Sequence, residues 1–284
     1  VSMQELLALQ SDFPERLRNI PDIPRAIYLL GRLPEEEEVT VGIIGARDGT
    51  GYGKAIARRL AGELSQYGIG IVSGMAYGID TAAHEGALSA GGKTYAVLGS
   101  GADICYPAAN RTIYEKIKES GGIISEYAPG SPPLPHHFVE RNRLLAGLSD
   151  VLIVIEAKER SGTFITVDRA LEQGKQVFAV PGRITDPLSK GCNKLLQEGA
   201  SLCLSATDIL RCFSIEEKET ERVRVQKLPK EELAIYQALG EEGKDMNALV
   251  RELKIPINKL YASLLNMEIS GYCEVFGNTY HRRT

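Results

Sequence analysis

The residues with the clearest chemistry in this 284-residue sequence are arginines and small polar residues, a combination suited to phosphate binding. An arginine guanidinium stays charged and can donate two parallel hydrogen bonds to phosphate oxygens. Glycine allows close backbone approach, and hydroxyl groups add donors without adding charge. The arginines are Arg47, Arg141, Arg143, Arg160 and Arg183, and the small residues are Gly45, Ser73-Gly74, Gly99-Ser100-Gly101, Ser161-Gly162-Thr163 and Pro181-Gly182. So many loops indicate a surface that contacts several phosphates rather than one.

A glycine-rich turn at 45–54, GARDGTGYGK, is followed by a run with helical spacing. A helix start favours anions because its first N–H groups are free and its dipole is positive there. A nucleotide P-loop needs serine or threonine after Gly-Lys, but here Ala55 follows Lys54. A dinucleotide site needs G-x-G-x-x-G and an acidic residue after the second strand, where this chain has Ser73-Gly74. The turn therefore predicts a phosphate contact without a P-loop or an NAD site.

Five aromatic residues lie beside these loops in the sequence: Tyr52, Tyr77, Tyr106, Phe138 and Phe164. Aromatic faces can stack on exposed bases, at roughly 1–3 kcal/mol per base. Core packing is the alternative for each of them, above all for Tyr106 and Phe138. We favour Phe164 as a stacking residue because it follows the Ser161-Gly162-Thr163 loop directly.

Side chains for acid–base or metal chemistry are sparse. His84 falls on a predicted helix, where we expect it to pack or to cap, and His136 and His137 fall in a proline-rich segment expected to be a loop. No hydrolase elbow, zinc-protease motif or carboxylate pair is present. The five cysteines are odd in number and form no C-x-x-C pair, so we expect free thiols and no metal site. The missing nucleotide motifs likewise give no reason to expect a cofactor.

Strand-like runs alternate with helical ones from residue 39 onward, which predicts a doubly wound α/β domain with a mostly parallel sheet. We expect strands over 39–44, 69–72, 94–98, 122–125, 151–155 and 176–180, and helices over 53–66, 80–89, 110–118, 139–148 and 163–173. Right-handed crossovers bring the carboxyl ends of such strands to one edge, where ligands bind. The phosphate-binding residues should therefore gather at that edge.

Three further segments flank this domain, which we place at 39–210. Residues 1–38 contain four prolines between 11 and 34 and are expected to form an extended strap, and residues 211–228 a charged linker. Residues 229–284 contain three short helical runs and two strand-like runs around Gly277-Asn278, the parts of a winged helix. This last segment is near neutral, with 7 basic and 8 acidic residues over 228–284, so we expect it to contact protein or DNA only weakly.

The whole chain has a net charge of −4, ordinary hydrophobic content of 43% and no apolar run near the ~20 residues of a membrane span. The amino terminus does not resemble a secretory signal, although the chain could lack its native start. We therefore expect a cytoplasmic protein without membrane contact.

Several of the motifs above resemble, in order, those of the DprA/Smf family of DNA-processing proteins. They are VGIIGAR (41–47), GIVSGMAYGIDTAAHEGAL (70–88), GKTYAVLGSGADICYPAANR (92–111), SEYAPG (125–130), RNRLLAGLSD (141–150), SGTFIT (161–166), ALEQGKQVFAVPG (170–182) and DPLSKGCNKLLQEGA (186–200). The resemblance covers about residues 13–205 and is specific.

The resemblance implies an extended Rossmann domain that binds single-stranded DNA as a homodimer and loads the RecA recombinase on it during natural transformation, without a nucleotide cofactor. Single-strand binding protein is a further expected partner. Arg47, Arg160 and Ser161-Gly162-Thr163 are similar to phosphate contacts, and Ser73-Gly74 and Gly99-Ser100-Gly101 to pocket walls. The full set of expected DNA contacts is Arg47, Lys54, Ser73, Gly74, Gly99, Ser100, Gly101, Arg141, Asn142, Arg143, Arg160, Ser161, Gly162, Thr163, Phe164, Thr166 and Arg183.

The chain departs from the family pattern in two places. Tyr77 stands where many relatives have a basic residue, so stacking or packing replaces a charge contact there. Many relatives also carry a helical amino-terminal domain, in whose place this chain has only the 11–34 strap.

Three functions remain in competition: a non-enzymatic single-stranded DNA binder, a nucleotide phosphoribohydrolase-like enzyme, and a nucleotide sensor that signals through the winged helix. The enzyme requires P-G-G before G-T and glutamates after it. This chain has Ser161-Gly162-Thr163 without that glycine pair, and the first acid after it is Asp168. We favour the binder. Saturable binding of a mononucleotide would favour the sensor.

Overall fold

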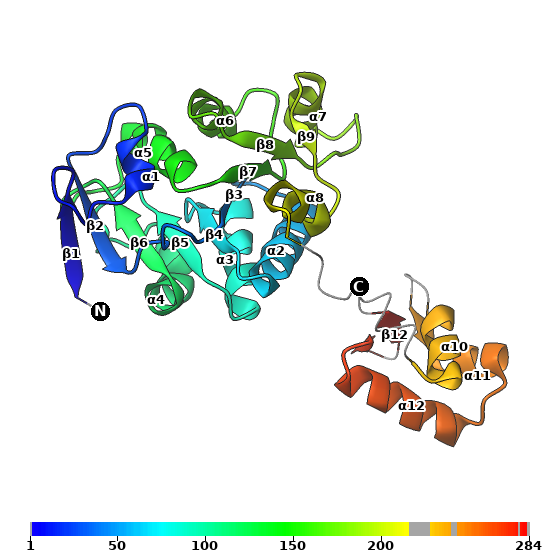
Figure 1. Ribbon diagram of the computed structural model, residues 1–284. Coiled ribbons are helices and arrows are strands. Elements are labelled where there is room, and N and C mark those ends of the chain that lie inside the picture. Colours follow the sequence, from blue (N-terminus) through cyan, green and yellow to red (C-terminus); the bar gives the residue numbers. More distant parts are fainter. Residues whose placement is uncertain (1, 216–227, 240–242, 278, 283–284) are drawn as a thin grey trace. The chain divides into compact units, whose positions relative to one another are not determined.

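The computed structural model describes residues 2–215, 228–239, 243–277 and 279–282 (Figure 1). The chain divides into two compact units, 1–215 and 216–284, which are described separately. Most of the predicted linker, 216–227, lies outside the described residues. Its first part differs from the prediction, because Arg211–Phe213 forms a short 3-10 helix, η2.

The first unit is built on a nine-stranded sheet in the order β1-β2-β6-β5-β4-β3-β7-β8-β9. The strands are β1 Met3–Leu7, β2 Ala26–Gly31, β3 Thr40–Ile44, β4 Gly70–Ser73, β5 Thr94–Val97, β6 Gly122–Ser125, β7 Val151–Val154, β8 Gln176–Ala179 and β9 Ser201–Leu202. From β6 to β9 all neighbouring pairs are parallel. The α/β fold class with a mostly parallel sheet is confirmed, since each of the six predicted strands has its counterpart.

The strand order reverses direction between β3 and β7. From β3 the chain adds β4, β5 and β6 on one side, and then returns to add β7, β8 and β9 on the other. In open α/β sheets such a switch point separates the loops that follow the two central strands, which opens a crevice at the carboxyl edge. Here those are the loops after β3 and β7.

Helices cover both faces of the sheet. They are α1 Glu15–Arg18, α2 Gly51–Gln66, α3 Ile79–Ser89, α4 Arg111–Ser120, α5 Pro135–Gly147, α6 Thr163–Glu172, α7 Lys190–Gln197 and α8 Ala206–Leu210, with the 3-10 helix η1 Ala108–Asn110 before α4. Successive strand residues point to opposite faces. Ile44 and Val154 accordingly pack with α5, α6 and α7, whereas Ile43 and Ile153 pack with α2, α3 and α8. The two central loops therefore lead into helices on opposite faces, α2 and α6.

The amino-terminal segment is not the predicted extended strap. Strand β2 pairs antiparallel with β6, and β1 pairs antiparallel with β2, so the segment extends the sheet. The apolar alternation of AIYLLG in β2 buries Ile27, Leu29 and Leu30 and explains the strand. The four prolines lie outside both strands, where a missing N–H does not interrupt a ladder. The prolines had indicated an extended segment, but the short apolar run at 26–31 between them pairs as a strand.

The second unit has the winged-helix fold that its sequence predicts. Its elements are α10 Lys230–Ala238, β10 Lys244–Asp245, α11 Met246–Leu253, α12 Ile257–Ile269, β11 Cys273–Phe276 and β12 Thr279–Arg282. A small core forms around Ile235, Leu249, Leu260 and Leu264, and the strands follow the order β10-β12-β11. Asn278 of the predicted turn lies outside the described residues.

None of the helices that the structure describes is long and apolar enough to cross a membrane.

Candidate nucleic-acid interface

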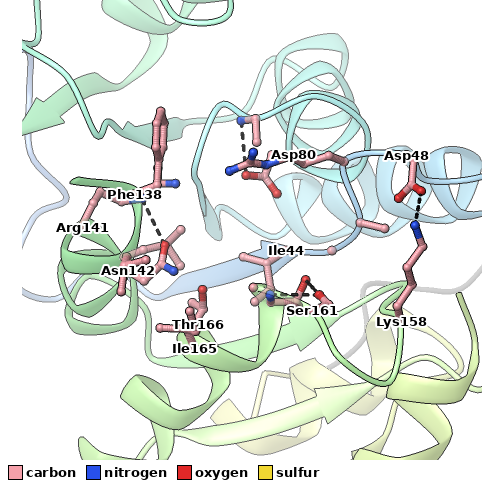
Figure 2. Close-up of a pocket in the computed structure, with 18 of the residues that line it drawn as sticks. Ile44, Asp48, Asp80, Phe138, Arg141, Asn142, Lys158, Ser161, Ile165 and Thr166 are labelled. Carbon is pink, nitrogen blue, oxygen red and sulfur yellow. Dashed lines mark hydrogen bonds and ion pairs between the residues drawn. The ribbon is translucent and has the colours of Figure 1, made fainter. Parts of the chain in front are cut away.

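A cavity of about 430 Å³ opens at the switch point of the sheet (Figure 2). Its lining comes from the end of β3 and the loop after it, from the loop between β4 and α3 with the start of α3, from α5, and from the loop between β7 and α6 with the start of α6. The predicted site residues that line it are Arg47, Arg141, Asn142, Arg160, Ser161, Gly162, Thr163 and Thr166. Four segments that are far apart in sequence thus supply one concave, strongly cationic site.

The start of α6 faces this cavity. The Ser161 hydroxyl accepts a hydrogen bond from the Thr163 amide at 3.0 Å and donates to the Thr163 hydroxyl at 2.8 Å, which fixes the turn into the helix. Gly162 is exposed, and a Cβ there would have no neighbour within 4 Å. A ten-residue helix begins here, so its positive dipole end adds to the field of the cavity. This place suits a phosphate.

The exposed cations of the cavity are Arg47, Arg160 and Lys158. Arg47 lies over the ring of Phe138, with its guanidinium carbon 5.6 Å from the ring centroid. Phe138 in turn contacts the Tyr106 ring at 5.6 Å between centroids. An aromatic surface therefore adjoins the positive charges, an arrangement that suits a nucleotide with its base and its phosphate.

Arg141, which the sequence predicted to contact DNA, lies in the floor of the cavity. It is 5% exposed, and its guanidinium donates to the carbonyl oxygens of Gly74, at 2.9 Å, and Val97. Burial lowers its pKa to about 10, while Asp80 opposes that shift. These hydrogen bonds join α5 to the backbone at the ends of β4 and β5. Arg141 therefore mainly stabilises the packing of α5 on the sheet.

Asp80 is the buried counterpart of Arg141. Its carboxylate accepts hydrogen bonds from the amides of Gly74 and Ala76 at 3.2 and 3.3 Å. Burial raises its pKa to about 6, against the opposing effects of those bonds and of Arg141 and Arg47. A Cβ on Gly74 would lie 2.7 Å from both Asp80 and Arg141, so only glycine fits between them.

The predicted pocket walls are buried elsewhere. The Ser73 hydroxyl donates to the Ile43 carbonyl at 2.6 Å, so it is not available to a ligand. The Gly99-Ser100-Gly101 loop is buried beneath the first turn of α5, where a Cβ on Gly99 would meet Phe138 at 2.9 Å. Neither segment lines the cavity, and both instead support the loops that do.

The glycine-rich turn also differs from its prediction. At the start of α2 the Thr50 amide and hydroxyl donate to the two carboxylate oxygens of Glu156, at 2.8 and 2.6 Å. A Cβ on Gly53 would collide with the same carboxylate. The chain's own carboxylate thus fills the place where an anion was expected. Lys54 lies inside α2 and does not line the cavity.

Three other predicted contacts lie outside the cavity. Arg143 donates two hydrogen bonds to the Glu126 carboxylate, at 2.7 and 2.6 Å, and is only 13% exposed. Phe164 packs on the core beneath α7, with Lys194 near its ring, so core packing replaces the predicted stacking. Arg183 is exposed but does not line this cavity.

Two histidine predictions have different outcomes. His84 is a buried packing residue, as predicted: its Nδ1 lies 2.7 Å from the Thr94 hydroxyl, and burial lowers its pKa to about 3. His136 and His137 belong to α5 rather than to a loop. Pro135 occupies the first position of that helix, where a missing N–H is tolerated. The prolines before it had suggested irregular structure.

Lys158 and Asp48 line the cavity but are not among the site residues predicted from the sequence, and Phe138, for which core packing was the main alternative, also lines it. Lys158 stands two positions before Arg160 in the loop that carries Ser161-Gly162-Thr163, so its position in the loop was a usable signal. Asp48 follows Arg47 directly, but an acid in a cationic site is not suggested by a phosphate-binding pattern.

The chain matches known protein families over both of its units. Residues 4–214 match the family model of DNA recombination-mediator protein A, and residues 220–275 match the DprA winged helix domain. The DNA processing protein DprA of Streptococcus pneumoniae is 45% identical over 206 residues, 72% of each chain. Protein Smf of Escherichia coli is 32% identical over 292 residues, 98% of this chain and 77% of that protein.

The similar solved structures include two of DprA proteins. The X-ray structure of S. pneumoniae DprA has a TM-score of 0.70 and 43% identity over 74% of each chain. A structure of DNA processing protein A from Helicobacter pylori, described for its unique single-stranded DNA binding mode, has a TM-score of 0.66 and 31% identity, covering 75% of this chain and 95% of that one. The resemblance found in the sequence is confirmed: this chain belongs to the DNA recombination-mediator protein A family, that of the DprA and Smf proteins.

Proposed function

We propose that this chain binds single-stranded DNA in the cavity at the switch point of its sheet. The proposal rests on one observation: Arg47, Lys158 and Arg160 line the same concave site as the start of α6. Guanidinium groups and a helix start bind phosphate oxygens without reading a base. The site therefore supports a sequence-independent grip on the backbone.

The apolar part of the lining favours a single strand over a duplex. Phe138 and Val139 add an apolar wall to the charged lining. The bases of a single strand are free to lie against such a wall, whereas paired bases are stacked inside their helix. The relative from H. pylori, described for its single-stranded DNA binding mode, agrees with this choice.

Binding without catalysis is the favoured role. Asp80 is buried and accepts two backbone amides, and Asp48 is paired with Lys158, so both acids of the described cavity lining have partners. We accordingly propose a non-enzymatic protein that works without a cofactor. Phosphoribohydrolase and sensor functions have no comparable support in this site.

The wider role follows from the family. We propose a cytoplasmic homodimer that protects incoming single-stranded DNA and loads RecA on it during transformation or recombination, alongside single-strand binding protein. In the second unit, the exposed residues of α12 include Ile257, Tyr261 and Leu265. Because residues 228–284 are near neutral, with 7 basic and 8 acidic residues, we expect the second unit to add little to the grip on DNA.

Fluorescence anisotropy tests the proposal. A labelled oligo-dT strand is titrated with the full chain at two salt concentrations, beside a duplex of equal length. We expect preference for the single strand and a slope of log affinity against log salt of about −0.7 per phosphate neutralised. Equal affinity for the duplex, or no binding at low salt, would contradict the proposal.

A further inference from the structure

One ion pair crosses the mouth of the cavity. Lys158 Nζ lies 2.5 Å from Asp48 Oδ2, and Figure 2 shows the two side chains facing each other. Lys158 comes from the loop after β7 and Asp48 from the loop after β3, so the pair spans the switch point. Both residues line the cavity.

The lining of the cavity carries more cations than acids, and the Asp48–Lys158 pair contains its exposed acid. Among the described residues of the lining, the cations are Arg47, Arg141, Lys158 and Arg160, and the acids are Asp48 and Asp80. Asp80 is buried and bonded to backbone amides, so it belongs to the structure of the floor. Asp48 is 62% exposed at its side chain and holds one of the exposed cations that a phosphate would contact.

The backbone on both sides of the pair is anchored. A Cβ on Gly78 would collide with the Ala46 carbonyl and lie 2.5 Å from the Arg47 carbonyl oxygen, so this glycine packs directly on the loop that carries Asp48. A Cβ on Gly191 would lie 2.7 Å from the Lys158 carbonyl oxygen, so the start of α7 packs in the same way on the other loop. Only the two side chains need to move for the pair to separate.

Separation is easy because the pair is solvated. The Lys158 side chain is 54% exposed, and ion pairs with such exposure contribute little to stability. A DNA phosphate carries the same charge as the Asp48 carboxylate and can take its place on the ammonium group. Binding of the strand then becomes an exchange of one anion for another.

We propose that Asp48 is an internal competitor of the DNA phosphate, which holds Lys158 until a strand displaces it and so limits the affinity of the site. The inference rests on the proposed function and assigns Asp48 a regulatory role within the same cavity. It also explains why an acid follows Arg47 in an otherwise cationic surface.

The test compares Asp48→Asn with the wild type in the anisotropy titration with oligo-dT. We expect Asp48→Asn to bind about three- to tenfold more tightly, since it removes the competitor and leaves Lys158 in place. The salt slope should steepen, because in the wild type the Asp48 carboxylate that is released on binding takes up a cation and offsets part of the counterion release, whereas Asp48→Asn has no such offset. Glu172→Gln is the matched control: it removes the same charge from an exposed ion pair with Arg169, at the far end of α6, and should leave affinity unchanged.

A double-mutant cycle separates exchange from simple repulsion. In the Lys158→Ala background, Asp48→Asn should give a clearly smaller gain and no steeper slope, because there is no ammonium group to release. Equal gains in both backgrounds, or no gain in the wild-type background, would overturn the inference. Failure of the wild type to bind oligo-dT would instead contradict the proposed function, so the two results are distinct.

Discussion

Helices α2 and α6 begin at the same crevice on opposite faces of one sheet, and their amino termini have different occupants. At α2 the Glu156 carboxylate accepts hydrogen bonds from Thr50 and fills the space beside Gly53. At α6, Ser161, Gly162 and Thr163 face the cavity, with open space at Gly162. A glycine-rich loop before a helix therefore does not by itself indicate a ligand, because a carboxylate from a neighbouring loop, here the one after β7, can take the ligand's place.

The largest expected effect on DNA affinity comes from substitutions beside the start of α6, the helix end with open space. We expect Arg47→Ala combined with Arg160→Ala to weaken oligo-dT binding by about a hundredfold or more, since each charge-assisted hydrogen bond contributes roughly 1.5–3 kcal/mol. Both side chains are exposed, so the melting temperature should move by about 2 °C or less. Anisotropy and thermal melting check the two parts, and loss of the fold would show that the arginines are structural.

The buried carboxylate beneath the cavity should give a pH signature. Burial raises the pKa of Asp80 to about 6, above its ordinary value of 3.8. Between about pH 4 and 6 the folded state therefore binds more protons than the unfolded state, and the contribution of Asp80 to stability falls as pH rises through this window. At pH 7 the loss amounts to at most about 3 kcal/mol.

Urea unfolding of the wild type and of Asp80→Asn at several pH values measures this effect. The difference between the two proteins isolates Asp80 from the other carboxylates. It should change between pH 4 and 6 and be constant above pH 7. A difference that does not vary with pH would show that Asp80 titrates normally.

At the start of α2, which the Glu156 carboxylate fills, a substitution should lower the stability of the protein rather than its affinity for DNA. Glu156→Ala leaves the Thr50 amide and hydroxyl without their partner, which lowers the free energy of unfolding by about 1–3 kcal/mol. Affinity for oligo-dT should stay within about threefold of the wild type. A folded variant with as large a loss of affinity as the double arginine variant would remove the distinction between the two helix ends.

The smallest expected effect is that of Lys54→Ala. Lys54 lies in α2 outside the cavity, so its removal should change oligo-dT affinity less than about twofold at moderate salt, where distant exposed charges are screened. Arg47→Ala, measured beside it, serves as the positive reference. A loss with Lys54→Ala equal to that reference would place DNA along α2.

Much of the fold was predictable because buried parallel strands are continuous apolar runs, such as VLIV in β7. The β1–β2 pair was missed because β2 is a short apolar run among prolines. For the site, position along the chain was enough to find Arg47, Arg160 and Ser161-Gly162-Thr163, since all follow strands at the carboxyl edge.

What the sequence did not reveal was which charges have internal partners. Arg143 and Arg160 look alike in the sequence, yet Arg143 is bonded to Glu126, 17 residues away, whereas Arg160 is exposed at the cavity. The Glu156 carboxylate meets Thr50 across 106 residues. Such partners depend on tertiary packing, which strand and helix patterns do not specify.

A crystal structure of the full chain with bound oligo-dT tests the central claim most directly. We predict a backbone phosphate at the start of α6, within hydrogen-bond distance of Arg47 or Arg160, with Glu156 still bonded to Thr50. DNA bound along α2 or on the winged helix, with the cavity left empty, would contradict it.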